Sequence, residues 1–151
     1  MKIAIGSDHA GYELKAHLAA WLEKNGYEVH DLGTGDAEAR AGSPECGEAV
    51  GGEVAEGKAD KGIVVCGSGI GISIAANKVN GIRAALVHDP ESAIMSRRHN
   101  DANVLALSGR PFSREKAENA EKTAKAWLET AFDGGRHAVR VQMLSDIEKR
   151  Q

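Results

Sequence analysis

The stretch Ile63-Val64-Val65-Cys66-Gly67-Ser68-Gly69-Ile70-Gly71 decides the fold of this chain. Its first four residues are apolar without polar alternation, which is typical of a strand covered on both faces of a sheet. The alternating glycines that follow are typical of a tight turn, and the chain continues in a helical pattern to Lys78. The stretch therefore predicts one strand–turn–helix unit of a parallel sheet.

The same alternation of apolar runs and helical patterns continues from one end of the chain to the other. Neither an internal repeat nor a linker interrupts it, so we expect a single domain over residues 1–151. The order predicts an α/β fold, a Rossmann-like open parallel five-stranded sheet with helices on both faces in three αβα layers. Strands are expected at residues 2–6, 27–32, 63–66, 82–87 and 104–107. Helices are expected at residues 11–26, 46–56, 70–78, 90–100, 113–132 and about 137–150.

Local signals set the boundaries of several elements. Gly26 is placed to end the first helix, and Ser113 is a typical N-cap of the long helix that follows it. Residues 33–45 are predicted as a loop because glycine and proline are frequent there. The last helix begins after Gly134-Gly135, when the sheet is already complete. Packing on its own body and reaching across to a second subunit are both open for it.

Length, charge and composition exclude several classes of protein. The 151 residues are enough for one domain that buries roughly two-thirds of its unfolded surface. No apolar run approaches the ~20 residues that span a bilayer, so we expect no membrane insertion. A net charge of −3, with two each of Trp, Tyr and Phe, disfavours a nucleic-acid partner. The two cysteines form neither a CxxC motif nor a disulfide scaffold, and no signal-peptide pattern follows Met1, so we expect a cytoplasmic, reduced protein.

In open parallel sheets, ligands bind outside the carboxyl ends of the strands. This rule selects residues 7–9 after the first strand, 66–71 after the third, 88–89 after the fourth and 108–110 after the fifth. The pair His99-Asn100 lies just before the last strand, so its position depends on how the preceding helix ends.

The glycine-rich loop after the third strand is a candidate anion site. Alternating glycines between a strand and a helix leave backbone N–H groups free to face an anion, and the helix N-terminus helps. One alternative is a tight turn that needs glycine only for its backbone angles. Another is a dinucleotide site, with Asp89 about twenty residues on as the ribose-binding acid. The spacing GxGxG and the position after the third strand disfavour a nicotinamide cofactor.

Cys66 and the pair Asp8-His9 are candidates for proton transfer. A thiol beside helix N–H groups ionises more readily than a free thiol and can act as a base. The alternative for a cysteine is a small buried core residue, which is the interpretation given to Cys46. Beside the glycine loop, we favour the base for Cys66. Asp8 can transfer protons or merely cap the first helix, and both alternatives are open.

Histidines and arginines supply the remaining candidates. The six histidines form neither an HxH nor an HExxH pattern, so we expect no metal site. Arg136 and Arg140 are four residues apart at the start of the last helix, where they share one face suited to a phosphate or carboxylate. The alternative is an ordinary charged helix face. Arg110 can join them if the fold or a partner subunit brings them together.

The motifs together resemble a known enzyme family. From residues 5–11 (IGSDHAG) to residues 134–137 (GGRH), with specific blocks at residues 66–78 and 96–103, the chain resembles the ribose/galactose sugar-phosphate isomerases. That family contains ribose-5-phosphate isomerase B and the galactose-6-phosphate isomerase subunits. The resemblance implies an aldose–ketose isomerase of the pentose phosphate pathway without metal or cofactor. It would interconvert ribose 5-phosphate and ribulose 5-phosphate through an enediolate.

The resemblance also implies which side chains move protons. Cys66 would match the base that transfers a proton between the first and second carbons of the sugar. His99, with Ser68 nearby, would match the acid that opens the furanose ring. Asp8 would move protons between the substrate oxygens.

Further residues would hold the substrate, some of them from a second chain. The resemblance implies a homodimer, or a dimer of dimers, with shared active sites to which Arg136 and Arg140 come from the other subunit. Asn100 and the N–H groups of Gly67, Ser68, Gly69, Ile70 and Gly71 would hold the enediolate charge. The phosphate would be held by His9, Arg110, Arg136 and Arg140.

One departure from the family concerns the substrate. Relatives usually carry Asp-Tyr-Pro in the loop after the second strand, whereas this chain has Gly42-Ser43-Pro44, so Ser43 stands where the aromatic residue would be. We therefore expect no aromatic side chain in the pocket. A tetrose phosphate, or a hexose phosphate such as galactose 6-phosphate or allose 6-phosphate, is the alternative substrate. A subunit of a hetero-oligomer and a non-catalytic nucleotide-binding module are further alternatives.

Overall fold

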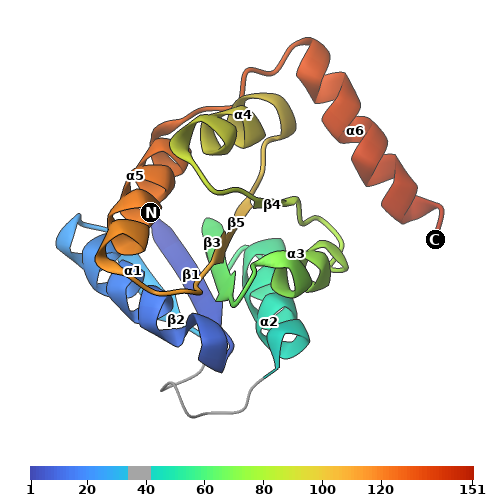
Figure 1. Cartoon of the computed structure of the whole chain (residues 1–151). Helices are drawn as coiled ribbons and strands as arrows, with labels where there is room; N and C mark the ends of the chain where they lie inside the picture. The colour runs from blue at the N-terminus through green and yellow to red at the C-terminus, as the bar shows by residue number, and fades with distance from the viewer. Residues whose placement is uncertain (34–41) are drawn as a thin grey trace.

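The structure, a computed structural model, describes residues 1–33 and 42–151 and consists of alternating strands and helices (Figure 1). The part of the predicted loop at residues 34–41 lies outside the described residues. The strands are β1 (Lys2–Ser7), β2 (Glu28–Asp31), β3 (Lys61–Cys66), β4 (Ala84–Leu86) and β5 (Val104–Ser108). The helices are the short 3-10 turn η1 (His9–Gly11), then α1 (Tyr12–Lys24), α2 (Ser43–Ala55), α3 (Ile70–Asn77), α4 (Pro90–Asn100), α5 (Arg114–Glu129) and α6 (Arg136–Lys149).

The five strands form one parallel sheet in the order β2-β1-β3-β5-β4, which confirms the predicted α/β fold. β3 lies at its centre, with Ile63 paired to Ile5 of β1 and to Leu105 of β5. Alternate residues of β3 point to opposite faces, and both faces are buried. This explains why the strand is apolar throughout.

Each face of the sheet is covered by helices, as the sequence predicted (Figure 1). On one face, Ile63 and Val65 of β3 pack with Leu18 of α1 and Trp127 of α5, both of which are fully buried. On the other face, Val64 packs against residues of α2 and α3 that include Val50, Ile72 and Ala76. The carboxyl end of β3 therefore sits between two closely packed layers.

Caps and turns confirm some predicted boundaries and correct others. Ser113 caps α5 by accepting a hydrogen bond from the Lys116 N–H at 3.0 Å, and Gly26 follows α1 with a φ of +88°, both as predicted. The prediction of a loop through residue 45 is wrong, because α2 already begins at Ser43. Pro44 lies in the first turn of α2, where its missing N–H is not needed.

Two predicted elements are too long. α5 ends at Glu129 rather than at residue 132, and the carbonyl of Thr130 accepts a hydrogen bond from Arg97 Nε at 3.1 Å instead of continuing the helix. β4 covers Ala84–Leu86 rather than residues 82–87. The Ile82 N–H turns back to the Val79 carbonyl at 3.1 Å, so it is not available for strand pairing.

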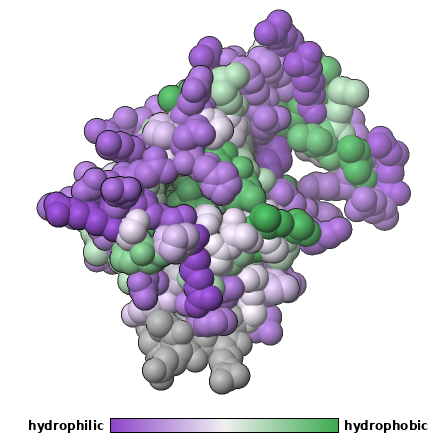
Figure 2. All heavy atoms as spheres, viewed as in Figure 1, coloured by the Kyte–Doolittle hydropathy of each residue, from purple (hydrophilic) through white to green (hydrophobic). Residues whose placement is uncertain are grey.

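Helix α6 stands away from the sheet, beside α4 (Figure 1). Four of its apolar side chains are exposed, and Figure 2 shows apolar side chains gathered along it. Its far end is tied to the body by a hydrogen bond from the Gly81 N–H to Glu148 at 2.8 Å. A pocket of about 430 Å³ lies between this part of α6 and the segments around β4. The helix therefore leaves part of its apolar surface uncovered within its own chain. The four exposed apolar side chains of α6 are those of Val139, Met143, Leu144 and Ile147.

No helix among the described residues is long and apolar enough to cross a membrane.

The turn η1 lies against the carboxyl end of β3, and Gly11 makes this close approach possible. Its φ of −96° suits any residue, so glycine is needed there for space. A Cβ at residue 11 would lie 2.4 Å from the Val65 carbonyl oxygen, whereas a Cβ at Gly52 of α2 would meet nothing within 4 Å.

The close approach at Gly11 predicts opposite effects for two glycine-to-alanine substitutions. Gly11→Ala should lower the free energy of unfolding by about 1–3 kcal/mol, because the sheet or the turn must shift. Gly52→Ala should raise it by about 0.5–1 kcal/mol through better helix propensity. Chemical denaturation of both variants measures the difference. Equal stability of Gly11→Ala and the wild type would contradict the packing described here.

Candidate active site

The carboxyl ends of β1, β3 and β5 bring three predicted segments together. The Gly109 N–H donates to the Cys66 carbonyl at 2.8 Å, and the Arg110 N–H donates to the Gly67 carbonyl at 3.2 Å. Ser108 Oγ donates to the same Gly67 carbonyl at 2.8 Å. The loops after β3 and β5 are thus held against each other, and η1 packs beside them through Gly11.

Asp8 is a buried carboxylate with both oxygens occupied. Oδ1 accepts a hydrogen bond from the Gly11 N–H at 2.9 Å, which caps η1. Oδ2 accepts a hydrogen bond from the Ser43 hydroxyl at 2.6 Å, and Asp8 is 9% exposed. The capping role is therefore real, but it uses only one oxygen. The other oxygen accepts its hydrogen bond from Ser43 in the first turn of α2, so the structure leaves the predicted role of Asp8 in proton transfer open.

Cys66 ends β3, and its sulfur faces the glycine loop. The residue is 4% exposed, and the Gly69 N–H donates to Sγ at 3.1 Å. A hydrogen bond donated to sulfur stabilises negative charge there, as a base requires. The second cysteine, Cys46, is also buried and donates to the Ser7 carbonyl at 3.0 Å, in agreement with its structural interpretation.

Gly69 needs its glycine for the backbone, whereas Gly71 does not. Gly69 has a φ of +80°, and a Cβ there would lie 2.5 Å from Leu86 Cδ1. A Cβ at Gly71 would meet nothing within 4 Å. Both residues lie where α3 begins, and Gly71 is exposed. The tight-turn interpretation therefore explains Gly69, while the open space at Gly71 leaves room for a ligand to approach the backbone.

His9 and Arg110 line one pocket of about 360 Å³ beside this loop. Glu13 and Phe112 also line it, and Phe112 is 40% exposed. The expectation that no aromatic side chain reaches the pocket is wrong for Phe112. The signal was present in the sequence, because Phe112 lies two residues after Arg110 in the segment that follows the last strand, beside the strand ends where ligands bind.

His99 and Asn100 lie beside the amino ends of the strands, opposite the carboxyl ends where Cys66 lies. The Asn100 carbonyl accepts a hydrogen bond from Arg83 Nε at 2.9 Å, and Arg83 directly precedes β4. Asp101 then ends α4 with a φ of +47°. A strand such as β3, with 6 residues, separates the two edges by roughly 20 Å. The sequence contained this signal too, because a helix that follows one parallel strand returns the chain to the amino edge before the next.

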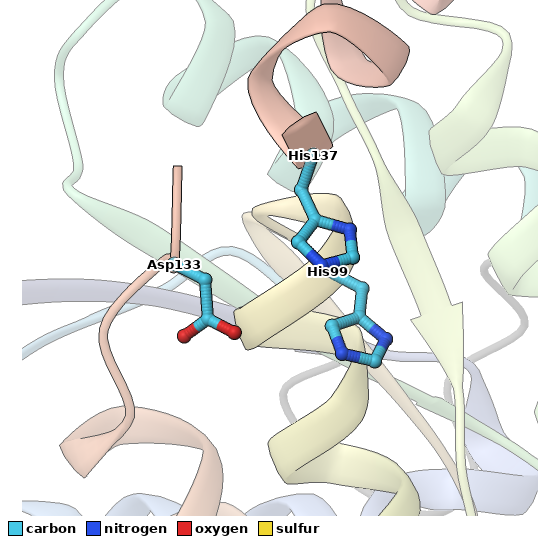
Figure 3. A group of neighbouring side chains, drawn as sticks. All are labelled: His99, Asp133 and His137. Carbon is cyan, nitrogen blue, oxygen red and sulfur yellow. The ribbon is translucent and has the colours of Figure 1, made fainter. Parts of the chain in front are cut away.

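Around His99, three segments meet (Figure 3). The rings of His99 and His137 stack with centroids 4.3 Å apart and an interplanar angle of 10°. Asp133 lies next to them, and Arg98 Nε donates to both of its carboxylate oxygens at 3.2 Å. His137 and Asp133 were missed by the sequence analysis, because no local spacing connects them to His99.

Positively charged side chains lie around the stacked rings of His99 and His137. Desolvation lowers the pKa of His137 below its ordinary value, and His99, Arg136 and Arg140 lower it further, against Asp133. Arg136 and Arg140 are exposed at the start of α6, as their shared helix face predicted. Such a surface suits an anionic ligand.

The predicted site residues thus form two groups, which lie apart from each other within this chain. One group lies at the carboxyl edge and the other at the amino edge of the same sheet. The first comprises Asp8, His9, Cys66, Gly67, Ser68, Gly69, Ile70, Gly71 and Arg110. The second comprises His99, Asn100, Arg136 and Arg140.

The chain is similar to known proteins over nearly its whole length. Residues 3–144 match the family model for Ribose/Galactose Isomerase. Over 150 residues the chain is 46% identical to ribose-5-phosphate isomerase B of Escherichia coli K12, covering 99% of this chain and 98% of that protein. It is 36% identical over 151 residues to D-erythrulose-4-phosphate isomerase of Pectobacterium atrosepticum, covering 100% and 97%. The structure of Clostridium thermocellum ribose-5-phosphate isomerase B superposes with a TM-score of 0.94 at 51% identity, covering 99% of each chain.

Fold, site segments and these likenesses define the class of the protein as an aldose–ketose isomerase. More narrowly, the chain belongs to the Ribose/Galactose Isomerase family, as the resemblance of its motifs indicated.

Proposed function

We propose that this enzyme interconverts ribose 5-phosphate and ribulose 5-phosphate by metal-free proton transfer through an enediolate. The observation that carries the proposal is the hydrogen bond that the Cys66 sulfur accepts from the Gly69 N–H at 3.1 Å, at the start of the glycine loop. Relatives at 46% and 51% identity are ribose-5-phosphate isomerases B, which supports the substrate.

The Cys66 thiolate acts as the base of the reaction. It takes the proton from C2 of the open-chain aldose, so that negative charge develops on O1 of the enediolate. The same proton returns from sulfur to C1 and completes the ketose. A proton next to a carbonyl is only weakly acidic, so the oxyanion needs donors that are already in position. In the loop at residues 67–71, the Gly69 N–H donates to Cys66 Sγ and the Ile70 N–H to Ser68 Oγ, so the N–H groups of Gly67, Ser68 and Gly71 supply these donors.

Asp8 moves the second proton, from O2 to O1 of the substrate. Its carboxylate is held by the Gly11 N–H and the Ser43 hydroxyl, so it needs no reorganisation when the substrate binds. His9 and Arg110 hold the phosphate in their shared pocket. Because the phosphate is remote from the reacting carbons, its binding energy serves to hold C1 and C2 in place.

We place the second group of residues in the active site of a neighbouring copy. His99 opens the sugar ring as an acid, Asn100 contacts the enediolate, and Arg136 and Arg140 reach the phosphate, all from the amino edge of a partner chain. In a two-fold homodimer, each carboxyl edge meets the amino edge of the other chain, so two equal sites form. The exposed apolar side chains of α6, and Ile70 and Ile74 of α3, which are each 54% exposed, supply surface for this contact.

Replacement of the base should abolish the reaction while leaving the fold unchanged. Cys66→Ala should lower kcat/KM for ribose 5-phosphate by about 10²–10⁴-fold, because a positioned base is lost. Circular dichroism and thermal unfolding should match the wild type. Cys46→Ala is the matched control, since this cysteine is equally buried but outside the glycine loop, and it should keep its activity. Full activity of Cys66→Ala would exclude the role of Cys66.

Two inactive variants should restore activity when they assemble together. Cys66→Ala and His99→Asn, co-expressed in equal amounts with separable tags, form mixed dimers in which one site combines the intact Cys66 with the intact His99. Random pairing then gives about one quarter of wild-type activity. Each variant alone stays inactive. If the mixture also stays inactive although mixed dimers are isolated, the site does not span two chains.

The preferred sugar depends on Ser43, and the tetrose phosphate is the second candidate substrate. The 36% identical relative is named for D-erythrulose 4-phosphate, and Ser43 offers far less bulk than the tyrosine expected at this position.

Two substitutions of Ser43 separate its hydrogen bond from its size. Ser43→Ala should lower kcat/KM about 10-fold or more for every substrate, because the Asp8 carboxylate loses its donor. Ser43→Tyr should instead change the ratio of activities among four-, five- and six-carbon sugar phosphates. Steady-state kinetics on this panel measure both effects. An unchanged ratio in Ser43→Tyr would remove Ser43 as a specificity determinant.

A further inference from the structure

Three metal-ligating side chains meet at the amino edge of the sheet. His99 comes from the end of α4, Asp133 from the connection after α5, and His137 from the start of α6 (Figure 3). One ligand atom from each residue lies within 4.8 Å of the other two. The proposed reaction uses His99 as an acid but gives no role to Asp133 or His137, so it does not explain why the three side chains lie together.

We propose that His99, Asp133 and His137 bind a divalent transition-metal ion of the zinc type, and that the bound ion inhibits the isomerase by occupying His99. The inhibition rests on the proposed function, whereas the binding site does not.

The ligand set suits this class of ion. Two imidazoles and one carboxylate are a common set for Zn²⁺, and three protein ligands leave a fourth position for water. With metal–ligand distances of 2.0–2.2 Å, the ligand atoms of a tetrahedral zinc site lie about 3.4 Å apart. The ligand atoms, which lie within 4.8 Å of one another, therefore have to approach each other by up to about 1.4 Å.

Side-chain rotation can supply this approach. A metal lies in the plane of each imidazole that it binds, so two rings stacked at 10° must turn before both can reach one ion. The χ2 torsion of histidine has a broad, shallow energy profile, so this turn costs little. His99 is half-buried and Asp133 is exposed, so both can move, while the buried His137 is the fixed point.

The charges around the cluster act in both directions. A metal ion binds the neutral form of an imidazole. Arg136 and Arg140 repel a cation. Asp133 offsets them, and its ion pair with Arg98 holds the carboxylate beside the rings. That pair lies at the surface, so the exchange of Arg98 for a metal sacrifices little.

Calorimetric titration of the whole protein with ZnCl₂, in a phosphate-free buffer, tests the binding. The wild type should bind one Zn²⁺ per chain, and His137→Asn and Asp133→Asn should each weaken the affinity by about 10–100-fold. His30→Asn is the matched control, because His30 also pairs with a carboxylate, Glu53 at 3.1 Å, but this cluster has no third ligand among the described residues. Its affinity should equal that of the wild type.

Cysteine is the competing ligand, and a second metal distinguishes it. Co²⁺ bound to the wild type should give no thiolate-to-metal charge-transfer band, and Cys66→Ala should bind Zn²⁺ as tightly as the wild type. A thiolate band, or loss of binding in Cys66→Ala, would overturn the site. Equal affinity of the wild type, His137→Asn and Asp133→Asn would overturn it as well.

Activity measurements then test the inhibition. Zn²⁺ should inhibit the isomerisation of ribose 5-phosphate reversibly, with recovery on adding a chelator. In His137→Asn, the inhibition, normalised to that variant's own metal-free activity, should weaken by the same factor as the affinity. Tight binding without inhibition would overturn the inhibitory role. An inactive metal-free wild type would overturn the proposed function, and the calorimetric titration would still decide the metal site.

Discussion

All five strands run in the same direction, and the rest of the molecule depends on this constraint. Parallel strands need crossover connections, so each strand is followed by a segment that returns the chain over one face of the sheet. Every carboxyl end therefore falls at one edge, where Asp8, Cys66 and Arg110 meet. Every return falls at the other edge, where α4 leaves His99. A single chain of this fold therefore holds the two groups of predicted site residues at opposite ends of its strands.

Packing and chemistry share the same atoms at the carboxyl edge. Asp8 closes η1 with one oxygen and faces Ser43 with the other. Gly11 lets that turn touch Val65, one residue before Cys66. The N–H of Gly69, the N-cap residue of α3, donates a hydrogen bond to the Cys66 sulfur. The groups that would carry the reaction are thus positioned by the contacts that join η1, β3 and α3, so the rigidity of the core is transmitted directly to the reacting atoms.

Sequence patterns anticipated those features that depend on neighbours along the chain. The apolar run at residues 63–66 indicated a doubly covered strand, and the glycines after it indicated the turn that now holds Cys66. The start of α2 at Ser43 was missed, because a glycine- and proline-rich stretch resembles a loop until Pro44 is recognised as a first-turn residue. The cluster of His99, Asp133 and His137 could not be foreseen, because its members come together only through the packing of α6 beside α4. The relative positions of residues at the two ends of the strands depend on how the whole sheet is assembled.

Helix α6 carries two arginines of the proposed site, and its own chain covers only part of its apolar surface. In the proposed assembly the arginines of this helix act in a neighbouring chain, so a substitution in the helix would show its effect in a pocket built by another polypeptide. Catalysis then follows mass action, and dilution below the dissociation constant of the pair lowers the turnover per chain without unfolding anything.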